Sequence, residues 1–368
     1  MLTLASYINY LLTGKKVVGI GEASGIFPVD KKTNNYDLNK IEIFNNLLNK
    51  KLPYSLLDIF PSIVPTGVVA GYLTEEGRDL LDESKELDIN IPFVPPEGDM
   101  QTGVVSTNAI KTNTGSASIG TSSNINIIIS KDISVHEEVN LMLTPNGNTN
   151  ALIHVSNGTT EINHLFRLFK ELLNKFNVDP SDDELYKMMF NSSLKGKIKE
   201  GKIYPIDYYS GELVTHLNSG RPLVIKEPDS KMDLANLMLS HIYSLLATIR
   251  IGVDILREKE GIKLDSLIGH GGFFKTEYVG QNMLSRALNV PVSTLDSASS
   301  GGPYGMAILA SYLFYKDKYD LESFLDDLVF KDQKVNTVMA SNDEIEDFNL
   351  FLDEYKKLFK IEEYSLSI

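Results

Sequence analysis

The sequence predicts an α/β protein built from two domains. The chain has 368 residues, which is too long for one ordinary hydrophobic core. Two strand–turn–strand patterns, over residues 116–129 and 141–155, imply antiparallel strands. From residue 230 onwards, helical patterns alternate with short apolar strands. Together these observations predict mixed sheets flanked by helices.

The first third of the chain predicts two helices and one irregular strand. We expect a helix over residues 2–12 and another over residues 38–49, with a loop rich in Gly, Asp and Asn between them. Residues 63–72 are rich in Val and Gly but alternate poorly, which indicates an irregular strand. The domain boundary is expected near residues 112–115.

Two β-hairpins are predicted in the middle of the chain. In the first, Asn124-Ile125-Asn126-Ile127 alternates polar and apolar residues with the period of a strand. The second hairpin turns at Pro145-Asn146-Gly147-Asn148, whose residue types are those of a turn.

A long amphipathic helix opens the last third. Ser230 and Asp233 have capping-box spacing and precede it, and Gly261 closes it. A capping box at Ser341 and Glu344 opens a final helix with an apolar stripe.

Between these two helices the pattern is strand, glycines, helix, strand. The strands are expected over residues 266–268 and 292–294, and the helix over residues 279–288. This order places backbone N–H groups and a helix N-terminus at a ligand.

Composition excludes several classes of function. A net charge of −14 and a pI near 5.0 argue against nucleic acid and anionic membranes as partners. The chain has no cysteine, so disulfides and thiolate chemistry are excluded. The start of the chain lacks the features of a signal peptide, and no apolar run approaches the ~18 residues of a membrane span. We therefore expect a cytoplasmic protein.

Two segments indicate phosphoryl transfer to an alcohol. A lone acid, Asp99, lies between Gly98 and Gly103, and Gly120-Thr121-Ser122 has the composition of a phosphate loop. The acid would accept the hydroxyl proton while backbone N–H groups hold phosphates. Taken alone, Asp99 is better interpreted as a turn residue, and Gly120-Thr121-Ser122 as a simple hairpin turn.

Five segments in register carry a family resemblance. They are Gly98-Asp99-x-x-x-Gly103, Gly120-Thr121-Ser122, Tyr209-Ser210-Gly211-Glu212, the cluster Gly269, Gly271 and Gly272 followed by Gln281, and Gly301-Gly302-Pro303-Tyr304-Gly305. In this order they resemble the FGGY family of carbohydrate kinases, which have the actin-like ATPase (ribonuclease H-like) fold. No Asp-Gly-Thr strand–turn–strand of that family is found at the start, so the resemblance implies an incomplete first domain.

The resemblance implies a remnant of the N-terminal kinase domain over residues 1–113 and a nucleotide-binding C-terminal domain over residues 114–368. Asp99 would be the general base and, with Gly98, would border the sugar. The residues expected to bind the nucleotide are Gly120, Thr121 and Ser122 for the phosphates, and Gly269, Gly271, Gly272 and Gln281 for the adenosine.

Three positions depart from the family pattern. Glu22 stands where an aspartate is expected, Leu213 replaces an arginine after Gly211-Glu212, and Ser299-Ser300 stands where an acid is usual. The identity of the sugar is therefore not carried over.

Two functions remain open. The first is an ATP-dependent kinase, with Mg²⁺, that phosphorylates a hydroxyl of a small sugar or polyol such as a ketopentose. No protein-held metal site is expected. The second is a non-catalytic nucleotide-binding remnant or a partner subunit of a split kinase. Both imply ATP or ADP as ligand, and the incomplete domain implies a homodimer or a companion N-terminal chain, with little turnover by this chain alone.

Overall fold

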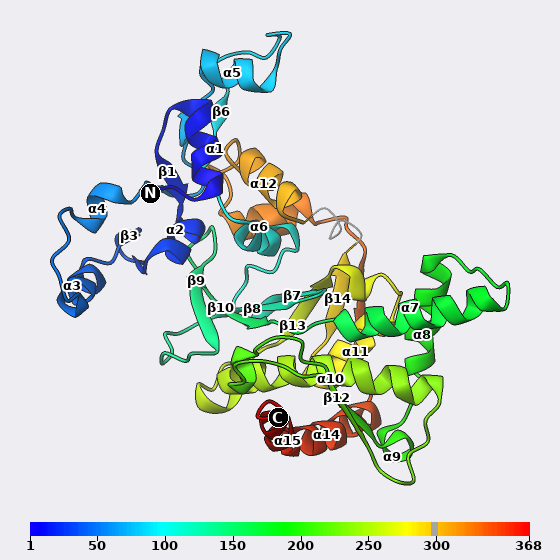
Figure 1. Cartoon of the computed structure of the whole chain (residues 1–368). Coiled ribbons are helices and arrows are strands. Elements are labelled where there is room, and N and C mark those ends of the chain that lie inside the picture. Colours follow the sequence, from blue (N-terminus) through cyan, green and yellow to red (C-terminus); the bar gives the residue numbers. More distant parts are fainter. Residues whose placement is uncertain (296–300) are drawn as a thin grey trace.

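A seven-stranded mixed sheet forms the centre of the protein (Figure 1). The computed structural model describes residues 1–295 and 301–368. The strand order is β15-β14-β13-β7-β8-β10-β9, and β13 pairs in parallel with both β7 and β14, whereas the other neighbours are antiparallel. The strands are β7 (Thr114–Ile119), β8 (Ser123–Ile129), β9 (Val139–Leu143), β10 (Thr149–Val155), β13 (Ser266–His270), β14 (Val292–Leu295) and β15 (Val335–Val338). The predicted α/β class, mixed sheet and two hairpins are confirmed.

Helices pack around this sheet, with α10 directly against it and α14 and α15 beyond (Figure 1). They are α7 (Thr160–Lys175), α8 (Asp182–Ser193), α9 (Ile198–Gly201), α10 (Leu234–Asp254), α11 (Val279–Leu288), α14 (Asn342–Lys357) and α15 (Phe359–Ser365). A small sheet of β11 (Ile203–Ile206) and β12 (Leu223–Lys226) lies beside α9 and α10.

The start of α10 corrects one prediction. The side chain of Asp233, not Ser230, caps the helix by accepting from the N–H of Asn236 at 2.9 Å. Ser230 instead donates its hydroxyl to the carbonyl of Lys202. Two residues of capping type lie close together here, and only tertiary contacts decide which of them caps.

The α10 helix also bears on membrane insertion. With the turn that follows, Leu234–Lys259 is one helix that is long and apolar enough to cross a membrane, although no such run was expected from the sequence. However, 89% of its most apolar window is buried inside the protein. Apolar residues all round a helix are as typical of a core helix as of a membrane span.

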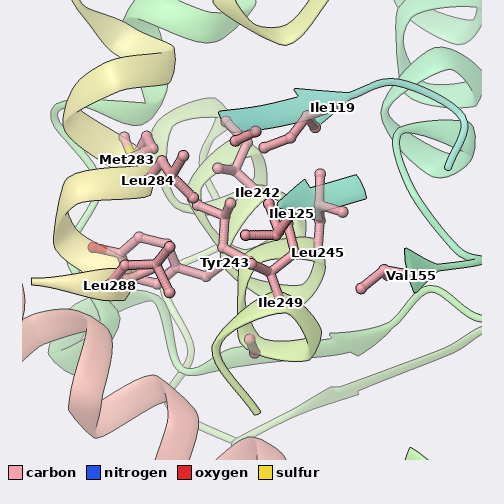
Figure 2. Close-up of a cluster of buried hydrophobic side chains, with 14 of the residues drawn as sticks. Ile119, Ile125, Val155, Ile242, Tyr243, Leu245, Ile249, Met283, Leu284 and Leu288 are labelled. Carbon is pink, nitrogen blue, oxygen red and sulfur yellow. The ribbon is translucent and has the colours of Figure 1, made fainter. Parts of the chain in front are cut away.

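The main core joins the sheet to α10 and α11 (Figure 2). Ile119 and Ile125 from the hairpin meet Ile242, Leu245 and Leu284 from the helices, and all five side chains are buried. Contact is close enough that a Cβ at Gly252 of α10 would lie 2.5 Å from the Ile153 side chain. The core therefore holds this part of the sheet against α10 and α11.

The first 113 residues form short helices and two-stranded sheets (Figure 1). The helices are α1 (Leu4–Thr13), α2 (Ile20–Ile26), α3 (Leu38–Leu47), α4 (Leu56–Ile59), α5 (Glu75–Leu81) and α6 (Asp99–Ser106). The strands are β1 (Val17–Gly19), β2 (Val29–Asp30), β3 (Asn35–Tyr36), β4 (Ser62–Val64), β5 (Gly71–Tyr72) and β6 (Pro92–Phe93).

The irregular strand expected over residues 63–72 is in fact two strands. β4 pairs in parallel with β1, and β5 pairs antiparallel with β6. The segment between them turns at Gly67, which has a φ of +78° and separates the two pairings. The Val and Gly content that suggested one strand reflects this turn.

The chain returns to this first region between β14 and β15 of the central sheet. α12 (Gly301–Tyr312) crosses α6 so closely that a Cβ on Gly305 would lie 2.0 Å from the carbonyl oxygen of Thr102. Apolar residues of α6, α12 and α13 (Leu321–Phe324) share one buried cluster. The division at residue 113 therefore stays a prediction, since residues after 300 pack with residues before it.

Candidate active site

Three strands bring glycines to one edge of the central sheet. β7 and β13 are parallel neighbours, and β10 runs in the same direction as β7 because both pair antiparallel with β8. The ends of all three strands therefore lie at one edge. Gly120 of the predicted phosphate loop and Gly271 of the predicted adenosine motif follow two of these ends, and Gly158 follows the third.

Backbone contacts join two of these turns. The N–H of Gly158 donates to the carbonyl of Thr121, and that of Thr159 to the carbonyl of Gly120, both at 2.9 Å. A Cβ on Gly158 would lie 2.1 Å from the oxygen of Gly120, so no other residue fits there. Gly158 was not singled out from the sequence, and nothing in its local pattern marks it.

Gly271 is the third glycine at this edge of the sheet. Its φ of +94° favours glycine, and a Cβ there would lie 3.2 Å from the carbonyl oxygen of Ile119. The structure thus places the hairpin Gly120-Thr121-Ser122 beside Gly271. Thr121 and Ser122 are exposed at the tip of the hairpin.

A cavity of about 290 Å³ opens beside these turns. Gly120, Thr159 and Gly272 line it from the sheet edge, and buried rings of Phe190 and Phe273 line it from below. Its other lining side chains, from α7, α8 and the turn before α11, include Asn163, Asp182, Asp183, Tyr186, Lys187, Lys275 and Thr276. An apolar floor with a few polar groups at the rim is typical of a small-molecule site.

Two residues predicted to border the adenosine have contacts inside the fold instead. A Cβ on Gly269 would lie 2.3 Å from the ring of Phe274, so this glycine makes room for that ring. The buried Gln281 donates its side-chain amide to the carbonyl of Asn336 at 2.8 Å. Neither residue lines the cavity, and a nucleotide contact by either remains a prediction.

The predicted base, Asp99, is the first residue of α6 and is exposed. Gly98 precedes it in an extended conformation, and a Cβ there would lie 2.3 Å from Oε2 of Glu22. On the other side, a Cβ on Gly302 would lie 3.6 Å from the Cβ of Asp99. Asp99 therefore lies between α2 and α12, with a glycine on either side of it.

Asp99 and the cavity belong to separate parts of the structure. Among the described residues, no hydrogen bond links Asp99 to the Gly120–Ser122 hairpin, and Asp99 does not line the cavity. The exposed carboxylate of Asp99 lies at the start of α6, whereas the cavity lies at the edge of the central sheet.

Glu97, a buried acid two residues before Asp99, was not predicted from the sequence to belong to the site. Its oxygens accept from the backbone N–H groups of Gly21 at 3.1 Å and Glu22 at 2.6 Å, at the start of α2. Burial raises the pKa of Glu97 to about 8, and the charge of Glu22 adds to this, whereas the two N–H groups oppose it. The only sequence signal was an acid at the end of an apolar run, directly before Gly98.

Replacing Glu97 with Gln is expected to remove a pH dependence of stability. Because the pKa is higher in the folded than in the unfolded chain, the stabilisation by Glu97 is complete below about pH 4.5 and is lost as the pH rises towards 8. At about 1.4 kcal/mol per pH unit, the effect is a few kcal/mol at most. Urea unfolding of wild type and variant at pH 5, 6.5 and 8 measures it.

The variant should therefore gain stability relative to the wild type as the pH rises. Gln keeps only one of the two acceptors, and this loss is an offset that does not change with pH. Glu83→Gln, at an exposed acid, is the matched control. Parallel pH profiles for wild type and Glu97→Gln would show that Glu97 is ionised throughout.

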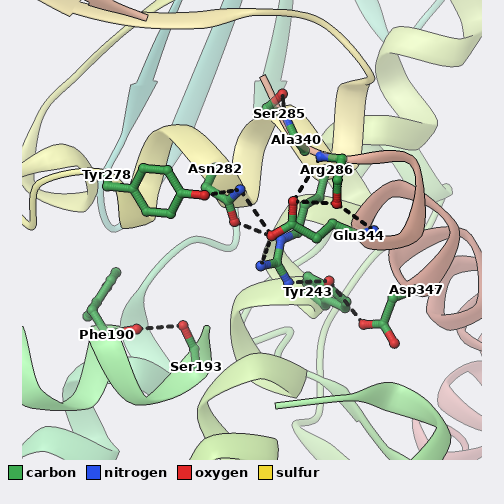
Figure 3. A network of polar contacts seen from close by, with 11 residues as sticks. Phe190, Ser193, Tyr243, Tyr278, Asn282, Ser285, Arg286, Ala340, Glu344 and Asp347 are labelled. Carbon is green, nitrogen blue, oxygen red and sulfur yellow. Dashed lines mark hydrogen bonds and ion pairs between the residues drawn. The ribbon is translucent and has the colours of Figure 1, made fainter. Parts of the chain in front are cut away.

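A polar network holds α11 in place behind the glycines (Figure 3). The buried Arg286 donates to Glu344 at 2.6 Å, to Asn282 at 2.8 Å and to the hydroxyl of Tyr243 at 3.2 Å. The Tyr243 hydroxyl donates in turn to Asp347. This network ties α11 to α10 and α14 and so fixes the turn that carries Gly272.

The part of the chain that the structure describes holds no preformed metal site. Among residues 1–295 and 301–368, no group of three or more His, Asp or Glu side chains could hold a metal ion. The carboxylate of Glu22 lies over Gly98, next to Asp99 in the chain. Mg²⁺ commonly binds through one or two carboxylates and substrate phosphates, and this pair fits that pattern.

Two of the departures from the family pattern can be located. Glu22 lies in the first turn of α2, over Gly98. Leu213 begins a short 3₁₀ turn and is 48% exposed. Ser299 and Ser300 lie outside the described residues.

Comparison with known proteins supports these motifs. Residues 115–314 match the model of the C-terminal domain of the FGGY family of carbohydrate kinases. A xylulose kinase of Haemophilus influenzae is 24% identical over 300 residues, which is 80% of this chain and 56% of that protein. The chain thus spans a little over half the length of this relative.

Solved structures share the fold. A ligand-bound xylulose kinase from Lactobacillus acidophilus superposes with a TM-score of 0.74 at 16% identity, covering 98% of this chain and 67% of that one. A glycerol kinase from Plasmodium falciparum, solved with ADP, gives 0.73 at 15% identity, with 98% and 66% covered. A gluconate kinase from L. acidophilus gives 0.74 at 17%, with 98% and 67% covered. The predicted actin-like ATPase fold is confirmed.

Proposed function

Because this chain belongs to the FGGY family of carbohydrate kinases, we propose that it performs ATP-dependent phosphorylation of a hydroxyl on a small sugar or polyol. The observation that carries the proposal is the convergence of Gly120 and Gly272, with Thr159, at the rim of one cavity. Glycines at strand ends let a phosphate approach the backbone N–H groups closely. The glycerol kinase neighbour, solved with ADP, supports the choice of an adenine nucleotide.

The roles divide between the two regions. The cavity beside Gly272 would take the adenosine, and the hairpin Gly120-Thr121-Ser122 would hold the phosphates. The exposed carboxylate of Asp99 would accept the proton of the sugar hydroxyl as that oxygen bonds to phosphorus and ADP leaves. Mg²⁺ bound with the ATP would supply charge neutralisation. Catalysis would depend mainly on the positioning of these groups.

The proposed substrate class is a ketopentose, and aldonates and polyols are its nearest alternatives. Relatives named for xylulose, gluconate and glycerol represent all three classes. Glu22, whose carboxylate lies over Gly98, would accept hydrogen bonds from substrate hydroxyls. An added anionic group on an aldonate would lie close to two carboxylates, which favours a neutral sugar.

Sugar-dependent release of ADP from ATP tests the proposal. We expect the rate to rise with at least one ketopentose, aldonate or polyol in a panel. Since the chain spans 56% of the H. influenzae relative, the assay is run with the chain alone and with the N-terminal part of that relative added. If no sugar stimulates ADP release, either by the chain alone or with the N-terminal part added, the result would contradict the proposed kinase function.

One observation favours the second function, a nucleotide-binding subunit that works with a partner. Leu4, Tyr7, Ile8 and Leu11 recur at helical spacing on α1, and each is at least 40% exposed. An apolar helix face of this kind is costly to leave in water. Self-association would cover it, so light scattering is expected to show a dimer that Ile8→Lys dissociates. A monomeric wild type that phosphorylates sugar alone would exclude this function.

A further inference from the structure

The segment after β10, residues 156–157, is held by the buried carboxylate of Glu212, which lies 55 and 56 positions further along the chain. Oε2 of Glu212 accepts from the backbone N–H groups of Ser156 at 2.9 Å and Asn157 at 3.2 Å, and from the side-chain amide of Asn157 at 3.1 Å. The other oxygen faces the N–H of Val214 at 3.5 Å. Glu212 has no exposed surface. In each of these contacts a neutral N–H group faces the carboxylate.

Asn157 fastens the same two segments from the other side. Its side-chain oxygen accepts from the N–H groups of Tyr209 at 2.8 Å and Ser210 at 3.0 Å. Its side-chain amide also faces the carbonyl of Ser210 at 3.3 Å. Asn157 is itself buried, so the two side chains form a closed clip between residues 156–157 and residues 209–212.

The clipped segment in turn holds the phosphate hairpin. The next two residues after Asn157 are Gly158 and Thr159, which donate their N–H groups to Thr121 and Gly120. Gly158 lies against this backbone with no room for a side chain. Thr159 lines the cavity. Because Gly158 directly follows Asn157, a movement of residues 156–157 would displace Gly158 and, with it, the hairpin that Gly158 contacts.

We propose that Glu212, with Asn157, is a positioning residue that holds the Gly120–Ser122 hairpin where it receives the nucleotide phosphates. The inference rests on the proposed nucleotide site. Glu212 does not touch the nucleotide, and it acts through Asn157 and Gly158. Removing it takes the carboxylate acceptor from four N–H groups, which favours their turning to water and displaces the hairpin. The floor of the cavity, made by Phe190 and Phe273, belongs to the main core and stays in place.

Calorimetric binding of ADP and of adenosine tests the proposal. Adenosine has no phosphate, so its affinity depends less on the hairpin than that of ADP does. Glu212→Ala is expected to weaken ADP binding by about 10-fold or more, the scale of a misplaced contact, while adenosine affinity changes much less. Glu212→Gln is the matched control, because its amide oxygen can take the place of Oε2 and keep all three donors bound. It should retain ADP affinity close to that of the wild type.

Amide hydrogen exchange provides a readout without ligand. Glu212→Ala should speed exchange at Gly158 and Thr159, and Glu212→Gln should not. If Glu212→Ala does not fold, Asn157→Ala gives the same comparisons. Undiminished ADP affinity with unchanged exchange, or equal losses for ADP and adenosine, would overturn the positioning role. A wild type that binds neither ligand would overturn the proposed function, and the exchange data would still decide whether the clip holds the hairpin.

Discussion

Replacing Gly272 with Val is expected to abolish ADP binding and leave the fold intact. In the structure, a Cβ at this position meets no atom within 4 Å, so the side chain has room in the free protein. That room belongs to the cavity, so the valine would occupy space the nucleotide needs. Overlap costing about 3 kcal/mol, at the upper end for an overpacked site, corresponds to a roughly 100-fold loss of affinity.

Calorimetry measures the affinity, and circular dichroism confirms that the variant is folded. Gly272→Ala, with a smaller side chain, should give a smaller loss. Lys226→Val, on the exposed side of β12, is a matched control that adds valine far from the cavity and should bind ADP normally. A folded Gly272→Val protein with wild-type affinity would place the nucleotide elsewhere.

The second large effect is expected for Asp99→Asn. Asparagine keeps the shape of the side chain but cannot accept the hydroxyl proton. Loss of a general base typically lowers the rate by ~10²–10⁴. Because Asp99 does not line the cavity, ADP affinity should stay the same. The sugar-dependent rate of ADP release, measured in whichever form of the enzyme is active, and an ADP titration test the two parts.

Asp317→Asn is the matched control, since this aspartate is exposed beyond the far end of α12 from Asp99. It should leave both rate and affinity unchanged. Near-normal turnover by Asp99→Asn would assign the base to another group. Glu22, whose carboxylate lies over Gly98, would then be the next residue to replace.

The sheet edge of the site could be predicted because its signals are local. The hairpin of β7 and β8 follows from alternation around one turn, and the bounds of α11 agree with the prediction of residues 279–288. Gly271 and Gly272 follow a short apolar strand, and strand ends at one edge meet without further information. Such patterns are set by neighbours in the sequence.

The walls and supports of the site could not be predicted, because they come from contacts between distant residues. Tyr186 and Phe190 of α8 close the cavity, although their spacing is simply that of a buried helix face. Glu212 bonds to residues 55 and 56 positions away, and Glu97 to residues 75 and 76 away. No local pattern distinguishes a buried, bonded carboxylate from one in solvent.

The return of α12 to α6 was likewise hidden. The glycines at 302 and 305 were recognised as a motif, but the reason for them is the close approach of Asp99 and Thr102. That approach places the start of α12 against the proposed base. Glycine reveals that something lies close by, and only the fold reveals what.

A crystal structure of the protein with ADP tests the central claim most directly. The adenosine is predicted in the cavity lined by Thr159, Phe273 and Gly272, with the phosphates against the N–H groups of the Gly120–Ser122 hairpin. ADP bound at any other place, or an empty cavity at a saturating concentration of ADP, would contradict it.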